Sequence, residues 1–165
     1  MGGMRDMRSL TDLLDRERRG GRELATARPG QWHVATVPTN LAAAVDSSVL
    51  VCLWDVEERM GGACHFVEPT GALDALEPGR YGNRAIAVLL DELEAAGCDR
   101  RRLRAKLFGG ADLRAGSDLG ARNVAVAEQV LDALDIPIVG ADTGGARPRK
   151  VTLHTDDFTA WVWRI

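Results

Sequence analysis

The chain has 165 residues and a mass of 17.8 kDa, which suits one domain with a hydrophobic core of its own. Hydrophobic residues make up 45% and charged residues 27%, the proportions of a folded globular protein rather than a disordered one. The apolar run from Val49 to Trp54 is far shorter than the roughly 20 residues of a spanning helix, so membrane insertion is excluded. A net charge of -3 gives no reason to expect a nucleic-acid partner.

The start of the chain and its cysteines indicate the cellular compartment. The first residues, from Met1 to Asp6, contain no apolar core of a secretory signal, so we expect a cytoplasmic protein. The three cysteines are an odd number without CxxC spacing, which speaks against both a disulfide framework and a zinc site. The histidines are scattered, and we expect no metal site.

Residues 1–30 differ from the remainder in charge, because they hold seven arginines against five acidic residues. Apolar residues recur there at helical spacing, at Met7, Leu10 and Leu14. This pattern is compatible with a short amphipathic helix over residues 7–19, and a frayed basic leader is the equal alternative. We expect the domain to comprise residues 31–165, and residues 1–28 to contribute little to its core.

From residue 31 onward, strand and helix patterns are mixed. Strands are predicted over residues 32–37, 48–54, 61–67, 103–108, 136–139, 150–154 and 158–163. Helices are predicted over residues 80–96 and 120–134, where leucine, isoleucine and valine recur at helical spacing. This mixture predicts an α+β fold in which a mixed sheet is backed by two core helices on one side.

Two neighbouring strands, over residues 48–54 and 61–67, form a predicted hairpin. If its turn centres on Val56-Glu57, Ser48 lies directly opposite His65, with Cβ atoms about 4.5–5.5 Å apart. That separation allows a hydrogen bond between a nucleophile and a base. We expect this pair at the mouth of a shallow groove.

Three cysteines are candidates for a substitute nucleophile. Cys52 shares a strand face with Ser48 but lies roughly 13 Å along the strand. Cys64 points to the face opposite that of His65, because side chains alternate along a strand. Cys98 follows a predicted helix end. We expect none of them to replace Ser48.

Five motifs then stand in order along the chain. They are the hairpin, Arg80-Tyr81-Gly82, Lys106 with Phe108-Gly109-Gly110-Ala111, Gly120-Ala121-Arg122-Asn123-Val124, and Asp142-Thr143-Gly144-Gly145 with residues 147–151. With these motifs the chain resembles the bacterial chemoreceptor glutamine deamidases, the CheD family, from about residue 33 to about residue 163. The resemblance implies a layered α/β/β sandwich akin to the cytotoxic necrotising factor toxins.

The resemblance also implies an activity and partners. Proteins of this family are protein-glutamine glutaminases of bacterial chemotaxis, which hydrolyse glutamine side chains of chemoreceptors to glutamate and release ammonia. They use a cysteine nucleophile, an activating histidine and an assisting threonine, without a metal or organic cofactor. The implied partners are a chemoreceptor and a CheC-like protein. The oligomeric state stays open.

The chain departs from the family pattern at two of the three catalytic positions. The histidine position is His65, but the cysteine position is Ser48 and the threonine position is Ala42. A serine hydroxyl is far less acidic than a thiol and needs a well-oriented base. We therefore expect a degenerate member, a pseudoenzyme that retains protein binding. The alternative is an active amide hydrolase that uses Ser48 and His65.

Three further residues from the matching motifs are assigned to substrate binding: Gly109, Gly110 and Asn123. The glycines are equally compatible with a turn that needs positive φ. Asn123, near a predicted helix start, can equally bond a neighbouring loop. Trp161 and Trp163 alternate on the last predicted strand and are expected in the core.

Overall fold

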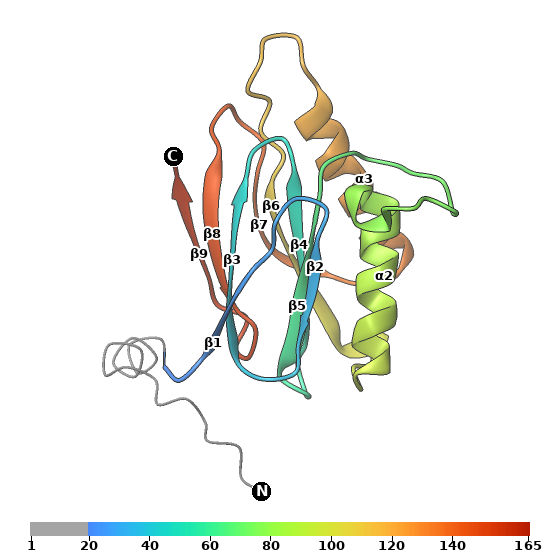
Figure 1. Ribbon diagram of the computed structural model, residues 1–165, viewed down its shortest axis with the longest axis vertical. Helices are drawn as coiled ribbons and strands as arrows, with labels where there is room; N and C mark the ends of the chain where they lie inside the picture. Colours follow the sequence, from blue (N-terminus) through green and yellow to red (C-terminus); the bar gives the residue numbers. More distant parts are fainter. Residues whose placement is uncertain (1–19) are drawn as a thin grey trace, which may run out of the picture.

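The computed structural model describes residues 20–165, and the helix predicted over residues 7–19 lies outside this part of the chain. The described residues form two sheets and two α-helices, stacked as three layers (Figure 1). The helices cover the outer face of one sheet, and the second sheet packs on the other face. The predicted α+β class with α/β/β layering is confirmed.

The five-stranded sheet is the middle layer. Its strand order is β2 (Trp32–Ala35), β5 (Met60–Phe66), β4 (Val49–Asp55), β6 (Leu103–Gly109) and β7 (Ile138–Thr143). β6 and β7 run parallel, and the other neighbours are antiparallel. The sheet is therefore mixed, as predicted.

The four-stranded sheet is the outer layer. Its strand order is β1 (Glu23–Thr26), β3 (Thr39–Val45), β8 (Arg149–His154) and β9 (Ala160–Arg164). β1 and β3 run parallel, and the other neighbours are antiparallel.

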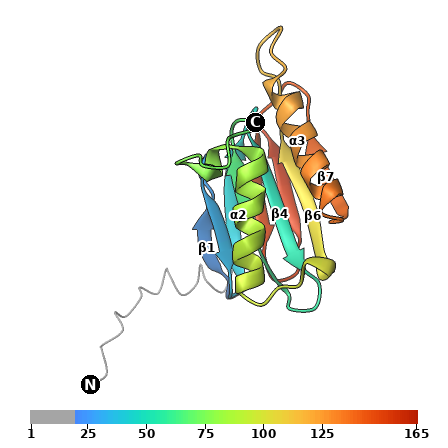
Figure 2. The same ribbon diagram turned by 90° about the vertical axis from the view of Figure 1, so that its right-hand side faces the viewer.

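The two helices are α2 (Gly82–Ala95) and α3 (Leu119–Ala133), close to the two predicted ranges. Short 3₁₀ turns, η1 (Pro78–Arg80) and η2 (Arg100–Arg102), precede α2 and β6. Figure 2 shows both helices in front of the same sheet face. Their buried side chains form one cluster with β4, β5 and β6.

The central strand β4 separates two hydrophobic clusters. Val49, Val51 and Leu53 pack toward the helices, whereas Leu50 and Cys52 pack toward the outer sheet. A strand buried on both faces appears in the sequence as a continuous apolar run rather than an alternating one. β4 therefore fixes the positions of all three layers.

β1 lies within the stretch that the sequence assigned to the leader. It pairs with β3 over four residues, so the outer sheet begins before residue 31. Ala27, directly after β1, is 1% exposed and belongs to the cluster between the sheets. Arg22 bonds Asp156 at 2.7 Å, in the turn between β8 and β9. For residues 20–28, the expectation of little contribution to the core is wrong.

Other features of the strands also differ from the prediction. β3 was not predicted, because its sequence Thr-Asn-Leu-Ala-Ala-Ala-Val is rich in alanine, which is uncommon in strands. β7 begins at Ile138 rather than at Ile136, because the N–H of Ile136 donates to Leu131 at the end of α3. Trp161 and Trp163 are 43% and 52% exposed, so their predicted place in the core is wrong.

None of the described helices is long and apolar enough to cross a membrane.

The role of β1 gives a stability prediction. A chain that begins at Pro29 should melt on the order of 5 °C below one that begins at Gly20, because it lacks β1, buried Ala27 and the Arg22–Asp156 pair. Thermal unfolding followed by circular dichroism measures the difference. Equal melting temperatures would show that residues 20–28 contribute nothing to the fold.

Candidate active site

The hairpin of β4 and β5 is present, but its register differs from the predicted one by two residues. His65 pairs with Leu50, so Ser48, directly before β4, lies diagonal to His65 rather than opposite it. The turn is centred on Glu57-Glu58, because the N–H groups of both residues donate to Asp55 Oδ1. A register shift of two residues leaves each side chain on the same face of the sheet. Ser48 and His65 therefore still meet.

The two side chains form a direct hydrogen bond. Ser48 Oγ lies 2.7 Å from His65 Nε2, and His65 Nδ1 lies 2.9 Å from the carbonyl oxygen of Ala27. A carbonyl oxygen only accepts, so Nδ1 carries the ring proton and donates it. Nε2 is then free to accept the hydroxyl proton of Ser48. This is the tautomer that a base needs to activate a nucleophile.

The pair is buried. His65 is 0% exposed and Ser48 is 3% exposed. Burial lowers the pKa of His65 from its ordinary value of 6.5, and the Ala27 carbonyl and the charge of Asp46 oppose that effect. The imidazole is therefore neutral near pH 7.

Backbone contacts fix Ser48 from both sides. Its N–H donates to Asp46 Oδ1 at 3.1 Å, and its carbonyl accepts from Gly110 at 2.9 Å. Gly109 has φ 108°, and a Cβ there would lie 2.3 Å from the Ser48 oxygen. A Cβ at Gly110 would lie 2.2 Å from Val124 of α3. Both glycines thus serve close backbone packing beside Ser48.

Asn123 connects α3 to the same region. Its side chain is fully buried, and Nδ2 donates to the carbonyls of Ser47 at 2.8 Å and Val67 at 3.1 Å. Ser47 precedes Ser48, and Val67 follows the strand of His65. The amide of Asn123 therefore ties together the two segments that carry the pair. Its Oδ1 has no hydrogen-bond partner among the described residues.

Ala42 does not face His65. Along β3, Leu41 and Ala43 belong to the cluster between the sheets, so the side chain of Ala42 points to the other face. Its carbonyl instead accepts the N–H of Ala27 at 2.8 Å. The main chain of Ala42 thus holds the residue that orients the imidazole.

The cysteines lie where the sequence placed them. Cys64 packs in the helix-side cluster, on the face opposite His65, and burial raises the pKa of its thiol to about 12. Cys52 packs between the sheets, where burial also raises its pKa. Burial raises the pKa of Cys98 to about 11. A thiol with a raised pKa is a poor nucleophile at neutral pH.

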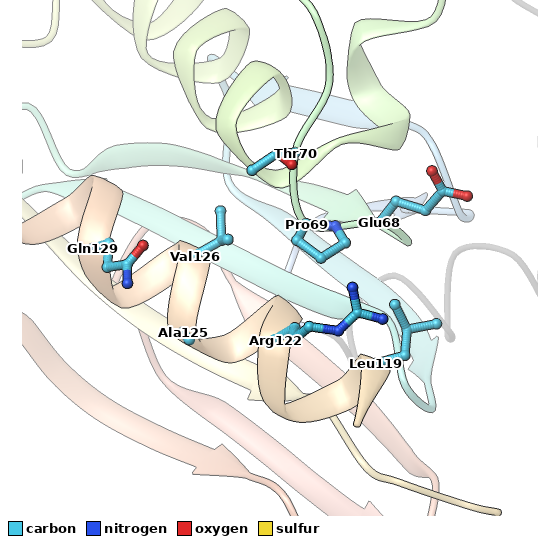
Figure 3. Close-up of a pocket in the computed structure, with 8 residues that line it drawn as sticks. All are labelled: Glu68, Pro69, Thr70, Leu119, Arg122, Ala125, Val126 and Gln129. Atoms are coloured by element: carbon cyan, nitrogen blue, oxygen red, sulfur yellow. The ribbon is translucent and has the colours of Figure 1, made fainter. Parts of the chain in front are cut away.

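A cavity of about 600 Å³ lies between α3 and the segment after β5 (Figure 3). It is lined by Glu68, Pro69, Thr70, Leu119, Arg122, Ala125, Val126 and Gln129. Neither Ser48 nor His65 lines it or the other cavities described among residues 20–165. The sequence predicts this pair at the mouth of a groove. In the structure, the pair is instead buried behind the surface. Within these residues, no group of three His, Cys, Asp or Glu side chains could hold a metal ion.

The fold and the pair define a class: an α/β/β protein with a nucleophile position beside a buried histidine. A family model described as CheD chemotactic sensory transduction matches residues 68–164. A probable chemoreceptor glutamine deamidase of Anaeromyxobacter dehalogenans is 40% identical over 150 residues, which cover 88% of this chain and 87% of that protein. The chain belongs to the CheD family.

Two more relatives support the assignment. A probable chemoreceptor glutamine deamidase of Sulfurimonas denitrificans is 37% identical over 131 residues, covering 76% of this chain and 84% of that protein. Another, of Geobacter sulfurreducens, is 36% identical over 132 residues, covering 78% and 81%. The resemblance found in the sequence motifs is confirmed.

The buried imidazole gives a pH prediction. Its pKa is lower in the folded protein than in the unfolded chain, so the unfolded chain binds more protons below about pH 6.5. The free energy of unfolding should therefore fall as the pH drops from 7.5 to 5.5. His65→Gln should remove part of this slope in urea titrations.

His154 supplies the matched control, because burial lowers its pKa as well but it lies outside the pair. His154→Gln should leave the contribution of His65 in place. An unchanged slope in His65→Gln would mean that the pKa of His65 is not lowered.

The bridge made by Asn123 gives a second prediction. Asn123→Ala removes the donor from two partly buried carbonyls, those of Ser47 and Val67, and should lower the free energy of unfolding by about 1–3 kcal/mol. Gln129→Ala, on the exposed side of the same helix, should change it by less than about 0.5 kcal/mol. Chemical denaturation measures the free energy of unfolding of both variants. Equal losses in the two variants would show that Asn123 has no special structural role.

Proposed function

We propose that this CheD-family protein binds a chemoreceptor or a CheC-like partner in the cytoplasm and deamidates glutamine slowly or not at all. The observation that carries the proposal is the environment of Ser48. Its hydroxyl bonds a buried imidazole whose other nitrogen bonds only a neutral carbonyl, that of Ala27. The proposal is also supported by three residues that hold the backbone of this site: Gly109, Gly110 and Asn123.

The chemistry explains the expected loss of rate. Deamidation would require Ser48 Oγ to attack the glutamine amide carbon while its proton moves to His65 Nε2. The proton then leaves with ammonia, and water hydrolyses the ester to glutamate and free serine. The imidazolium formed in the first step is buried, and burial disfavours the charged ring. Serine hydrolases place a carboxylate on Nδ1 to stabilise this charge.

A cysteine would avoid much of this difficulty. A thiol beside an imidazole can form a thiolate before the attack, and thiolate is strongly nucleophilic. The serine must instead lose its proton during the attack itself. The site geometry therefore suits a cysteine better than the serine that occupies it.

An active serine amide hydrolase is the second candidate. The distance of 2.7 Å between Ser48 Oγ and His65 Nε2 favours it, and so does the tautomer imposed by Ala27. In this case Ser48 is the nucleophile and His65 is the base and then the acid. Ala27 fixes the ring through its backbone alone.

Ammonia release from a purified, glutamine-containing chemoreceptor fragment separates the two candidates. We expect the unaltered protein to stay within about tenfold of Ser48→Ala, and Ser48→Cys to release ammonia at least about 100-fold faster. Ser47→Cys, which carries a thiol one residue away from the pair, is the matched control and should stay at background. Fast release that Ser48→Ala abolishes would replace the proposal with the active serine hydrolase.

A further inference from the structure

The segment between β5 and η1 exposes two leucines. Leu73 is 85% exposed and Leu76 is 98% exposed, more than any other large hydrophobic side chain in the described part of the chain. Figure 1 shows this loop standing out from the body of the protein beside α2. Residues 71–78 form this leucine loop. Its leucines contribute almost nothing to the core, so their exposure needs another reason.

The leucine loop is anchored at its first residue. Gly71 donates its N–H to Asn83 Oδ1 at 2.8 Å and accepts from Asn83 Nδ2 at 3.0 Å. A Cβ at Gly71 would lie 2.4 Å from the ring of Tyr81, so the loop start packs directly on that ring. Around Leu73, the N–H of Ala75 donates to the carbonyl of Ala72 at 3.1 Å and closes a turn.

The chain directly after the loop is anchored as well. A Cβ at Gly79 would lie 2.0 Å from the carbonyl of Gly30, so these two backbones pack closely. The loop therefore holds its two exposed leucines on a fixed support at both ends. A binding element that is ordered before binding loses less conformational entropy on association.

Both ends of the leucine loop are linked to the chain that carries the Ser48–His65 pair. The chain that leads into it continues from the strand of His65, and Asn123 holds Val67 on the way. Gly30, packed at the far end, donates its N–H to the carbonyl of His65 at 2.7 Å. A partner on the loop would thus rest against the end of the molecule that carries the pair.

Cavities lie on both sides of this part of the chain. The cavity of about 600 Å³ in Figure 3 is bounded by Glu68, Pro69 and Thr70. A second, of about 480 Å³, is bounded by Leu76 and Pro78 together with residues 29–32. A partner that covers the leucine loop could fill both hollows.

The charges around the loop are acidic. Asp74 and Glu77 belong to the loop, whereas Glu68 and Arg80, which flank it, pair with each other at 3.0 Å. Complementary charge favours a partner with lysine or arginine around an apolar cleft.

We propose that the leucine loop is the element that docks the chemoreceptor, with Leu73 and Leu76 in an apolar cleft of the receptor rimmed by lysine or arginine. This inference rests on the proposed protein-binding function. It adds the surface, the two anchoring side chains and the chemistry of the partner.

Binding of a purified cytoplasmic fragment of a chemoreceptor, measured by fluorescence anisotropy, tests the proposal. Leu73→Glu/Leu76→Glu should weaken binding at least about tenfold. Val139→Glu/Ile165→Glu adds the same charge at two other exposed apolar positions, and should change the affinity less than about twofold. Leu73→Ser/Leu76→Ser repeats the test without added charge.

Asn83→Ala tests the fixed support, because it keeps both leucines and removes the two bonds to Gly71. It should weaken binding about threefold. Equal affinity of the wild type and both leucine double variants would overturn the docking role of the loop and leave the proposed function intact. Absence of binding by the wild type itself would overturn the docking role of the loop together with chemoreceptor binding, and would leave the CheC-like partner of the proposed function.

Discussion

The imidazole of His65 is fully buried, so both of its nitrogen atoms must find hydrogen-bond partners inside the protein. Ala27, directly after β1 of the outer sheet, supplies one, and Ser48, directly before β4, supplies the other. The chain from Ala27 through the ring to Ser48 therefore links both sheets. β1 must pair with β3 to place Ala27, and the turn at Gly109-Gly110 must approach closely to place Ser48.

This arrangement has a chemical consequence. A ring with a neutral acceptor on one nitrogen and a hydroxyl on the other is well oriented, but burial keeps it neutral. A cysteine nucleophile and a serine nucleophile both need an imidazole ring that is oriented in this way. The serine also needs stabilisation of the positive ring during attack, and among residues 20–165 no carboxylate contacts His65 Nδ1. This difference is the physical basis of the proposed slow or absent deamidation.

Sequence patterns predicted much of the fold but less of the site. The spacing of apolar residues predicted both helices, and the predicted hairpin brought Ser48 and His65 together. The register of their hairpin depends on Asp55 accepting two turn N–H groups, which strand patterns do not contain. The acceptor on His65 Nδ1 is a backbone carbonyl, which every residue carries, so no residue type marks it. Alanine-rich β3 gave too weak a strand signal to place β1 beside it.

The protonation of His65 in solution tests the central claim most directly. Nitrogen-15 NMR of the histidine rings, with His65→Gln used to assign the signals, reports which ring nitrogen carries a proton at each pH. The account predicts a neutral His65 ring, protonated on Nδ1 and unprotonated on Nε2, from pH 8 down to about pH 6.5. A ring protonated on Nε2, or charged at pH 7, would contradict the hydrogen-bond chain from Ala27 to Ser48.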